Sequence, residues 1–186
     1  DPERVVDSYP HELSGGMQQR IVIAIALACS PLLLLADEPT TSLDVTVQAQ
    51  ILDLIRRLKE RFGASIIYIT HDMGVIAEIS DRVAVMYAGN VVEVAPVKEL
   101  FKNPLHPYTK ALLEAIPRPG ATFKSIPGTV PNLVNPPPGC RFHPRCPYAM
   151  PRCREEVPEL KRISEEHYVA CHLYGGEDHG EHSGGN

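Results

Sequence analysis

The sequence contains no uninterrupted apolar run that approaches the roughly 20 residues needed to span a bilayer. Its longest apolar stretches, 21–29 and 32–36, are separated by a serine and a proline. The opening residues show no signal-peptide pattern. Five cysteines among 186 residues are too sparse for a disulfide-rich secreted scaffold. These absences argue against a membrane-spanning chain and against a small disulfide-stapled one.

The chain also lacks an excess of positive charge. It carries 18 Lys and Arg against 23 Asp and Glu, a formal net charge of −5. A strongly basic nucleic-acid binder depends on neutralising phosphates, so no nucleic-acid partner is expected. Hydrophobic residues make up 44 %, which argues against wholesale disorder.

The composition changes along the chain. Only four of the 18 prolines precede residue 96, and four of the five cysteines lie at or beyond residue 140. We expect an α/β domain over 1–95 and an irregular, Pro- and Cys-rich module with a helical start over 96–174. The Gly-, His- and acid-rich tail, 175–186, is expected to be disordered.

Periodicity predicts the elements of the first half. Short apolar runs indicate strands buried on both faces, and helical spacing indicates crossover helices, the pattern of a parallel sheet. Gly89-Asn90 is a hairpin signal, and Cys29 is interpreted as a small buried residue. The expected helices are 15–28, 47–62, 73–79 and 107–116, and the expected strands are 32–36, 65–70, 83–88 and 91–95.

Two sequence features suggest chemistry. Asp37-Glu38 ends an apolar strand, where α/β proteins bind ligands, so Asp37 is placed to hold Mg²⁺ and Glu38 to activate a water. A solvated acidic strand end is the alternative. Ser14-Gly15-Gly16 opens a helix, where exposed N–H groups and the helix dipole favour phosphate. A Gly-Gly start costs helix stability, which suggests a reason beyond simple capping.

The ordered combination of four motifs resembles the nucleotide-binding subunits of ABC transporters. Residues 13–20 (Leu-Ser-Gly-Gly-Met-Gln-Gln-Arg) are similar to the ABC signature, and 32–38 are similar to Walker B with its catalytic glutamate. Ser42-Leu43-Asp44 resembles the D-loop, and Thr70-His71-Asp72 resembles the switch-histidine motif. The resemblance implies a partial P-loop NTPase (ABC-type) fold.

The resemblance also implies residue roles. Asp37 would coordinate Mg²⁺ through water, Glu38 would be the general base, and His71 would sense the γ-phosphate. Asp44 would couple two sites across a dimer, besides capping its helix. The signature residues, which would contact ATP held mainly by an opposite subunit, are Ser14, Gly15, Gly16 and Gln18.

One element of the family pattern is missing. The sequence contains no Gly-x-x-x-x-Gly-Lys-Ser/Thr, the loop that cradles the β- and γ-phosphates. We therefore expect the chain to be the C-terminal part of a longer subunit, and residues 1–186 alone to show no Mg²⁺-dependent ATPase.

The second half adds a subfamily. Residues 103–109 (Asn-Pro-Leu-His-Pro-Tyr-Thr) resemble the His-Pro-Tyr motif of oligopeptide and dipeptide importers. That resemblance implies ATP-driven import of peptides, or of similar small solutes, at the cytoplasmic face of the inner membrane. The implied partners are a second ATP-binding subunit, permease subunits and, indirectly, an extracytoplasmic solute-binding protein. A non-transport ABC-type ATPase and a metal-binding interaction module with an incomplete ATPase half are the alternatives.

The late cysteines suggest a metal site. Four thiols within a short Pro-rich stretch favour zinc or an iron–sulfur cluster over disulfides. The comparable cysteine set of peptide importers resembles a 4Fe-4S site, and the resemblance favours that cluster, whereas zinc could instead recruit a nearby histidine. The cysteines are Cys140, Cys146, Cys153 and Cys171, and the histidines are His143, His167 and His172.

Overall fold

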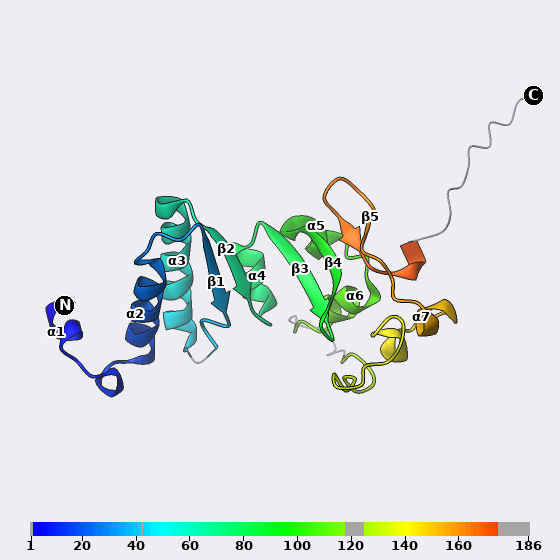
Figure 1. Ribbon diagram of the computed structural model, residues 1–186, viewed down its shortest axis with the longest axis horizontal. Helices are drawn as coiled ribbons and strands as arrows, with labels where there is room; N and C mark the ends of the chain where they lie inside the picture. Colours follow the sequence, from blue (N-terminus) through cyan, green and yellow to red (C-terminus); the bar gives the residue numbers. More distant parts are fainter. Residues whose placement is uncertain (1, 42, 118–124, 175–186) are drawn as a thin grey trace, which may run out of the picture. The chain divides into compact units, whose positions relative to one another are not determined.

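The computed structural model describes residues 2–41, 43–117 and 125–174 (Figure 1). The chain divides into two compact units, Asp1–Ile79 and Ser80–Asn186. The division therefore falls earlier than the expected boundary at residue 95. Neither Ser42 of the D-loop motif nor the tail expected to be disordered, 175–186, lies within the described residues. Among the helices that are described, none is long and apolar enough to cross a bilayer.

The first unit is built on a parallel pair of strands (Figure 1). Strand β1 (Leu33–Asp37) pairs in register with β2 (Ser65–Ile69), so that Asp37 stands beside Ile69. Helix α3 (Val45–Phe62) is the crossover between the strands, which confirms the predicted α/β pattern. The remaining elements are α1 (Pro2–Val6), η1 (Pro10–Glu12), α2 (Gly15–Leu27) and α4 (Met73–Ile79).

The core of this unit lies between the helices and one face of the strand pair. The predicted apolar spacing of α3 is confirmed, and Gly63 ends the helix in the left-handed conformation with φ of 63°. Ile66 and Tyr68 of β2 pack against the buried residues of α2 and α3, which are Ile23, Leu27, Ile51 and Ile55.

Two predictions about burial are wrong. The two strands expected to be covered on both faces leave Leu35 of β1 65 % exposed and Ile67 of β2 50 % exposed, because α2 and α3 cover only the opposite face. Cys29, interpreted as a small buried residue, is exposed. It lies in the turn between α2 and β1, directly after the C-cap residue Ala28.

The second unit contains an antiparallel sheet in the order β3-β4-β6-β5 (Figure 1). Strands β3 (Arg82–Tyr87) and β4 (Asn90–Pro96) form the predicted hairpin. Its turn lies one residue earlier than expected, because Ala88 and Gly89 take the positive φ values, 48° and 82°. Two short helices follow, α5 (Val97–Lys102) and α6 (Pro107–Glu114).

The cysteine-rich part is less irregular than the sequence suggests. Strand β6 (Tyr168–Val169) pairs with β4, and β5 (Lys161–Arg162) pairs with β6. The hairpin therefore belongs with the C-terminal part of the chain, which explains the position of the unit boundary. The helical turns of this part are η2 (His143–Arg145), α7 (Arg152–Glu155) and η3 (His172–Tyr174).

Candidate functional site

The carboxylate pair lies where β1 ends. Asp37 is the last residue of β1 and is exposed. Glu38 follows with φ of 44°, an uncommon conformation for a residue other than glycine, and its N–H donates to the Ile69 carbonyl at 2.9 Å. Positive φ at a non-glycine residue persists where the surroundings impose it, often at functional sites. The chain therefore turns sharply here while Glu38 stays attached to β2.

Both oxygens of the Glu38 carboxylate have partners. Oε1 lies 3.0 Å from Nδ1 of His71, and Oε2 accepts a hydrogen bond from Thr41 Oγ1 at 3.0 Å. The hydrogen bond with His71, and then that with Thr41, lowers the pKa of Glu38. The predicted Glu38 and His71 thus meet, because the parallel register brings the ends of β1 and β2 together.

The switch-like motif after β2 is held by its own side chains. Thr70 Oγ1 accepts from the Asp72 N–H at 3.0 Å, and Asp72 Oδ1 accepts from the Gly74 N–H at 2.8 Å. These bonds fix the turn into α4 and so the position of His71 between them.

The glycines that open α2 have a packing role. Ser14 is the N-cap of α2, and its hydroxyl accepts from the Met17 N–H at 3.4 Å. A Cβ added to Gly16 would lie 2.6 Å from Val47 Cγ1. One added to Gly15 would lie 3.3 Å from Leu43 Cδ2. The two glycines that open α2 therefore have a role besides capping, as expected from their cost to helix stability. They allow α2 to approach the start of α3 closely.

The other two expected nucleotide contacts have structural partners. The side-chain amide of Gln18 donates to the carbonyls of Pro10 at 2.7 Å and Leu13 at 3.2 Å. Asp44 is the N-cap of α3, and its Oδ1 accepts from the Val47 N–H at 2.9 Å. The capping role of Asp44 is confirmed, whereas its coupling role stays a prediction.

The four late cysteines are close enough to affect one another. Burial raises the pKa of Cys171 to about 11, and the neighbouring Cys140, Cys146 and Cys153 contribute in the same direction. Burial also raises the pKa of Cys140 and of Cys146. Backbone N–H groups oppose the shift, from Phe142 and His143 at Cys140, Tyr148 at Cys146 and Leu173 at Cys171.

The structure does not assemble these residues around a single ion. Within residues 2–41, 43–117 and 125–174, no three His, Cys, Asp or Glu side chains are arranged to hold a metal ion. Each of the histidines considered as a zinc ligand has a hydrogen-bond partner in the protein. His143 Nδ1 contacts the Cys140 carbonyl, and His172 Nε2 contacts the Glu156 carbonyl. His167 Nε2 lies 2.7 Å from Glu93 Oε1.

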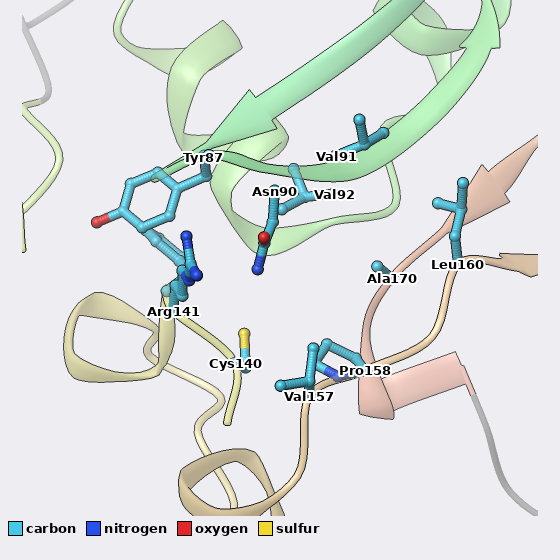
Figure 2. A pocket seen from close by; sticks show the side chains of 12 residues that line it. Tyr87, Asn90, Val91, Val92, Cys140, Arg141, Val157, Pro158, Leu160 and Ala170 are labelled. Atoms are coloured by element: carbon cyan, nitrogen blue, oxygen red, sulfur yellow. The ribbon is translucent and has the colours of Figure 1, made fainter. Parts of the chain in front are cut away.

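A cavity of about 260 Å³ is lined in part by Cys140 (Figure 2). In this view the Cys140 sulfur and the Asn90 amide point toward one another, while Val157 and Pro158 approach from the opposite side. Arg141 closes one end by donating from Nη1 to the Ala88 carbonyl. Cys140 therefore shares this cavity with Gly89 and Asn90 of the β3–β4 hairpin.

Sequence reasoning missed two groups. Thr41 was not singled out, although a hydroxyl three residues after a suspected base is within its reach. Glu93 was missed as well, since an acidic residue between valines in a strand is usually solvent-facing. Its partners come from residues 105, 106 and 167, and no local pattern shows that pairing.

Two families of known proteins match separate parts of the chain. Residues 1–41 match the family described as ABC transporter, and residues 92–153 match the family described as "Oligopeptide/dipeptide transporter, C-terminal region". These matches confirm the sequence resemblance to ABC transporter ATP-binding proteins. The match over 92–153 agrees with the resemblance to the oligopeptide/dipeptide importer type.

Similar proteins carry matching names. The chain is 57 % identical over 175 residues to "Probable peptide ABC transporter ATP-binding protein y4tR" of Sinorhizobium fredii, covering 92 % of this chain and 52 % of that protein. It is 51 % identical over 177 residues to "Dipeptide transport ATP-binding protein DppD" of Caldanaerobacter subterraneus, covering 94 % and 54 %. It is 54 % identical over 175 residues to "Oligopeptide transport ATP-binding protein AppD" of Bacillus subtilis, covering 92 % and 53 %. The chain spans about half the length of these relatives.

Proposed function

We propose that this chain is part of an ATP-hydrolysing subunit that energises the import of peptides across the cytoplasmic membrane. The contact between Glu38 and His71 carries the proposal, because a carboxylate next to a histidine beyond parallel strands suits water activation beside a phosphate. The names of the relatives support peptide import and do not favour a non-transport ATPase.

Each site residue has a chemical task in this proposal. Glu38 accepts the proton of the attacking water, while His71 contacts the γ-phosphate. The exposed Asp37 carboxylate is a suitable oxygen donor for Mg²⁺ through water, and the ion neutralises phosphate charge when bound. The α2 N-terminus with Ser14 and Gly15 faces ATP held mainly by an opposite subunit, for which its N–H groups are the donors.

The proposed assembly follows from a nucleotide site that two subunits share. A second ATP-binding subunit, identical or homologous, completes the nucleotide sandwich by pairing its Walker motifs with the signature residues of this one. Permease subunits form the membrane path, and a solute-binding protein delivers peptide from outside. The subunit then lies peripherally on the cytoplasmic face of the membrane, and residues 1–186 alone are expected to hydrolyse no ATP.

The test uses a full-length subunit that carries this chain, with its partner subunit. Glu38→Gln keeps the shape of the base but cannot take up the proton, so we expect ATP hydrolysis to fall by about 10²–10⁴-fold. The subunits should accumulate as an ATP-bound dimer. Glu60→Gln, at an exposed position of α3, is the matched control. Unchanged turnover in Glu38→Gln, or no nucleotide-dependent pairing, would refute the proposal.

We further propose that the four late cysteines hold an iron–sulfur cluster. The thiols raise one another's pKa values, and backbone N–H groups lower the pKa values of three of them; both effects support the proposal. A single zinc needs all four sulfurs about 2.3 Å from one point, whereas a cluster core separates them. Bound metal would supply the charge that buried thiolates need and would stabilise the fold.

Anaerobic purification tests this second proposal. Iron and acid-labile sulfide should co-purify with the chain and give a brown colour. Cys171→Ser should remove most of the iron. Cys29→Ser should not, because this exposed cysteine lies far from the other four in the sequence. A colourless protein with one zinc per chain would overturn the assignment.

A further inference from the structure

A buried carboxylate that takes no part in the proposed chemistry lies at the centre of the second unit. Glu93 of β4 is 0 % exposed. It accepts three hydrogen bonds: from the Leu105 N–H at 2.8 Å, from the His106 N–H at 2.9 Å and from His167 Nε2 at 2.7 Å. These four residues are called the Glu93 network.

Such a group is costly unless every partner is in place. Burying a carboxylate away from water is strongly unfavourable, and only charge-assisted hydrogen bonds offset the cost. Removing one partner of a buried charge therefore destabilises far more than the value of one surface hydrogen bond. Glu93 thus makes its partners depend on one another.

One side of the network is the His-Pro-Tyr segment. Glu93 binds the two N–H groups that directly precede α6, and His106 then caps the helix by accepting from the Tyr108 N–H at 3.0 Å. Burial lowers the pKa of His106 to about 4, which keeps Nδ1 free to accept. The motif named for its histidine is therefore a helix start that depends on a carboxylate from β4.

The other side is the segment of residues 161–174, which contains Cys171 and is called here the closing segment. His167 directly precedes β6, whose Val169 stands beside Glu93 in the sheet. The Ala170 N–H donates to the Val92 carbonyl at 2.8 Å, and Cys171 follows. Tyr174 Oη donates to the Leu105 carbonyl at 2.9 Å, so the closing segment also touches the His-Pro-Tyr segment directly.

We propose that the Glu93 network joins the His-Pro-Tyr segment and the closing segment into one conformational device, in which both segments open and close together. Docking of the closing segment thereby controls the start of α6. The inference goes beyond the proposed function and does not depend on ATP hydrolysis or on a metal.

Hydrogen exchange of the full chain, followed by mass spectrometry, tests the coupling. The readouts are the peptides covering 103–112 and 161–174, with 82–87 of β3 as the internal reference. His167→Ala removes a group from the closing segment only, yet we expect exchange to become roughly tenfold faster in both peptides. His167→Gln, which keeps an N–H donor, should restore much of the protection.

Variants of the carboxylate complete a double-mutant cycle. Glu93→Gln turns an amide nitrogen toward a hydrogen-bond donor and should loosen both segments, and Glu93→Ala should do so more strongly. Exchange in the double variant Glu93→Ala with His167→Ala should be only slightly faster than in Glu93→Ala alone, since both changes act through one network. Val85→Ala, a core change in β3, controls for general destabilisation and should speed exchange in 82–87 as well.

The outcomes separate a coupled device from ordinary stabilisation. If His167→Ala loosens 161–174 but leaves 103–112 as protected as before, the proposal is wrong. Additive effects in the cycle would overturn it equally. Should Glu93→Ala fail to fold, the comparison of His167→Ala with His167→Gln still decides the question.

Discussion

His71 Nδ1 lies 3.0 Å from Glu38 Oε1, although 33 positions separate the two residues in the sequence. The parallel register that places Asp37 beside Ile69 brings them together. The sharp turn at Glu38, with φ of 44°, then directs the carboxylate toward the end of β2. The contact is a consequence of strand pairing.

This contact predicts the effect of His71→Ala. The variant would lose the proposed phosphate contact, and it loses the hydrogen bond that chiefly lowers the pKa of Glu38, so that pKa should rise toward its ordinary value. We expect ATP turnover by a full-length subunit to fall by roughly 10²-fold, with little change in nucleotide affinity. Steady-state kinetics measures both; a change confined to KM would contradict the assigned role.

Gly16→Ala tests the approach of α2 to α3. At a solvent-exposed helix position, replacing glycine by alanine would raise the free energy of unfolding by roughly 1 kcal/mol. Here the new Cβ would lie 2.6 Å from Val47 Cγ1, so we expect destabilisation by roughly 1–3 kcal/mol. Thermal unfolding measures the effect. Val47→Ala in the same chain should relieve the clash, and a stabilised Gly16→Ala single variant would show that the helices do not meet there.

His106→Asn tests the pH dependence of the second unit. The folded pKa of about 4 lies below the ordinary value of 6.5, so the unfolded chain binds more protons between these pH values. Stability is therefore full above about pH 6.5 and falls as the pH drops toward 4, by on the order of 3 kcal/mol. Asparagine keeps a helix cap but does not titrate. Urea unfolding from pH 7.5 to 4.5 should show a flatter profile for the variant, and parallel profiles would count against the buried neutral histidine.

Arg145→Lys tests how the Pro-rich segment is held. The guanidinium donates from Nε to the Pro127 carbonyl at 2.8 Å and from Nη2 to the Ile126 carbonyl at 3.0 Å. Lysine keeps the charge but cannot form this fork. We expect faster proteolytic cleavage near residue 127, measured by mass spectrometry, while Arg154→Lys at an exposed position should leave cleavage unchanged. Equal cleavage in both variants would mean that the fork does not hold the segment.

The elements of the first unit could be predicted because their signals are local. Helix α4 begins and ends where expected, since Asp72 supplies a cap and the apolar spacing is short-range. Gly63 ends α3 for the reason read from the sequence, its tolerance of a positive φ. Glu38 and His71 could each be placed at a strand end, because each follows an apolar run of the expected parallel sheet.

Burial and long-range pairing could not be predicted. Leu35 and Cys29 have the composition of core residues, yet the helices cover only one face of the strands, and the turn after α2 leaves the cysteine exposed. The partners of two histidines considered as zinc ligands could not be predicted either, since His167 contacts Glu93 and His172 contacts the Glu156 carbonyl.

The amino-acid sequence by itself determined the order of helices and strands, the carboxylate at a strand end and the family, because periodicity, caps and motifs act over a few residues. Only the tertiary structure decided which faces are covered, why Gly16 must lack a side chain, and that Glu93 holds residues 105, 106 and 167 together. Those properties depend on contacts between distant segments, whose energies no local pattern contains.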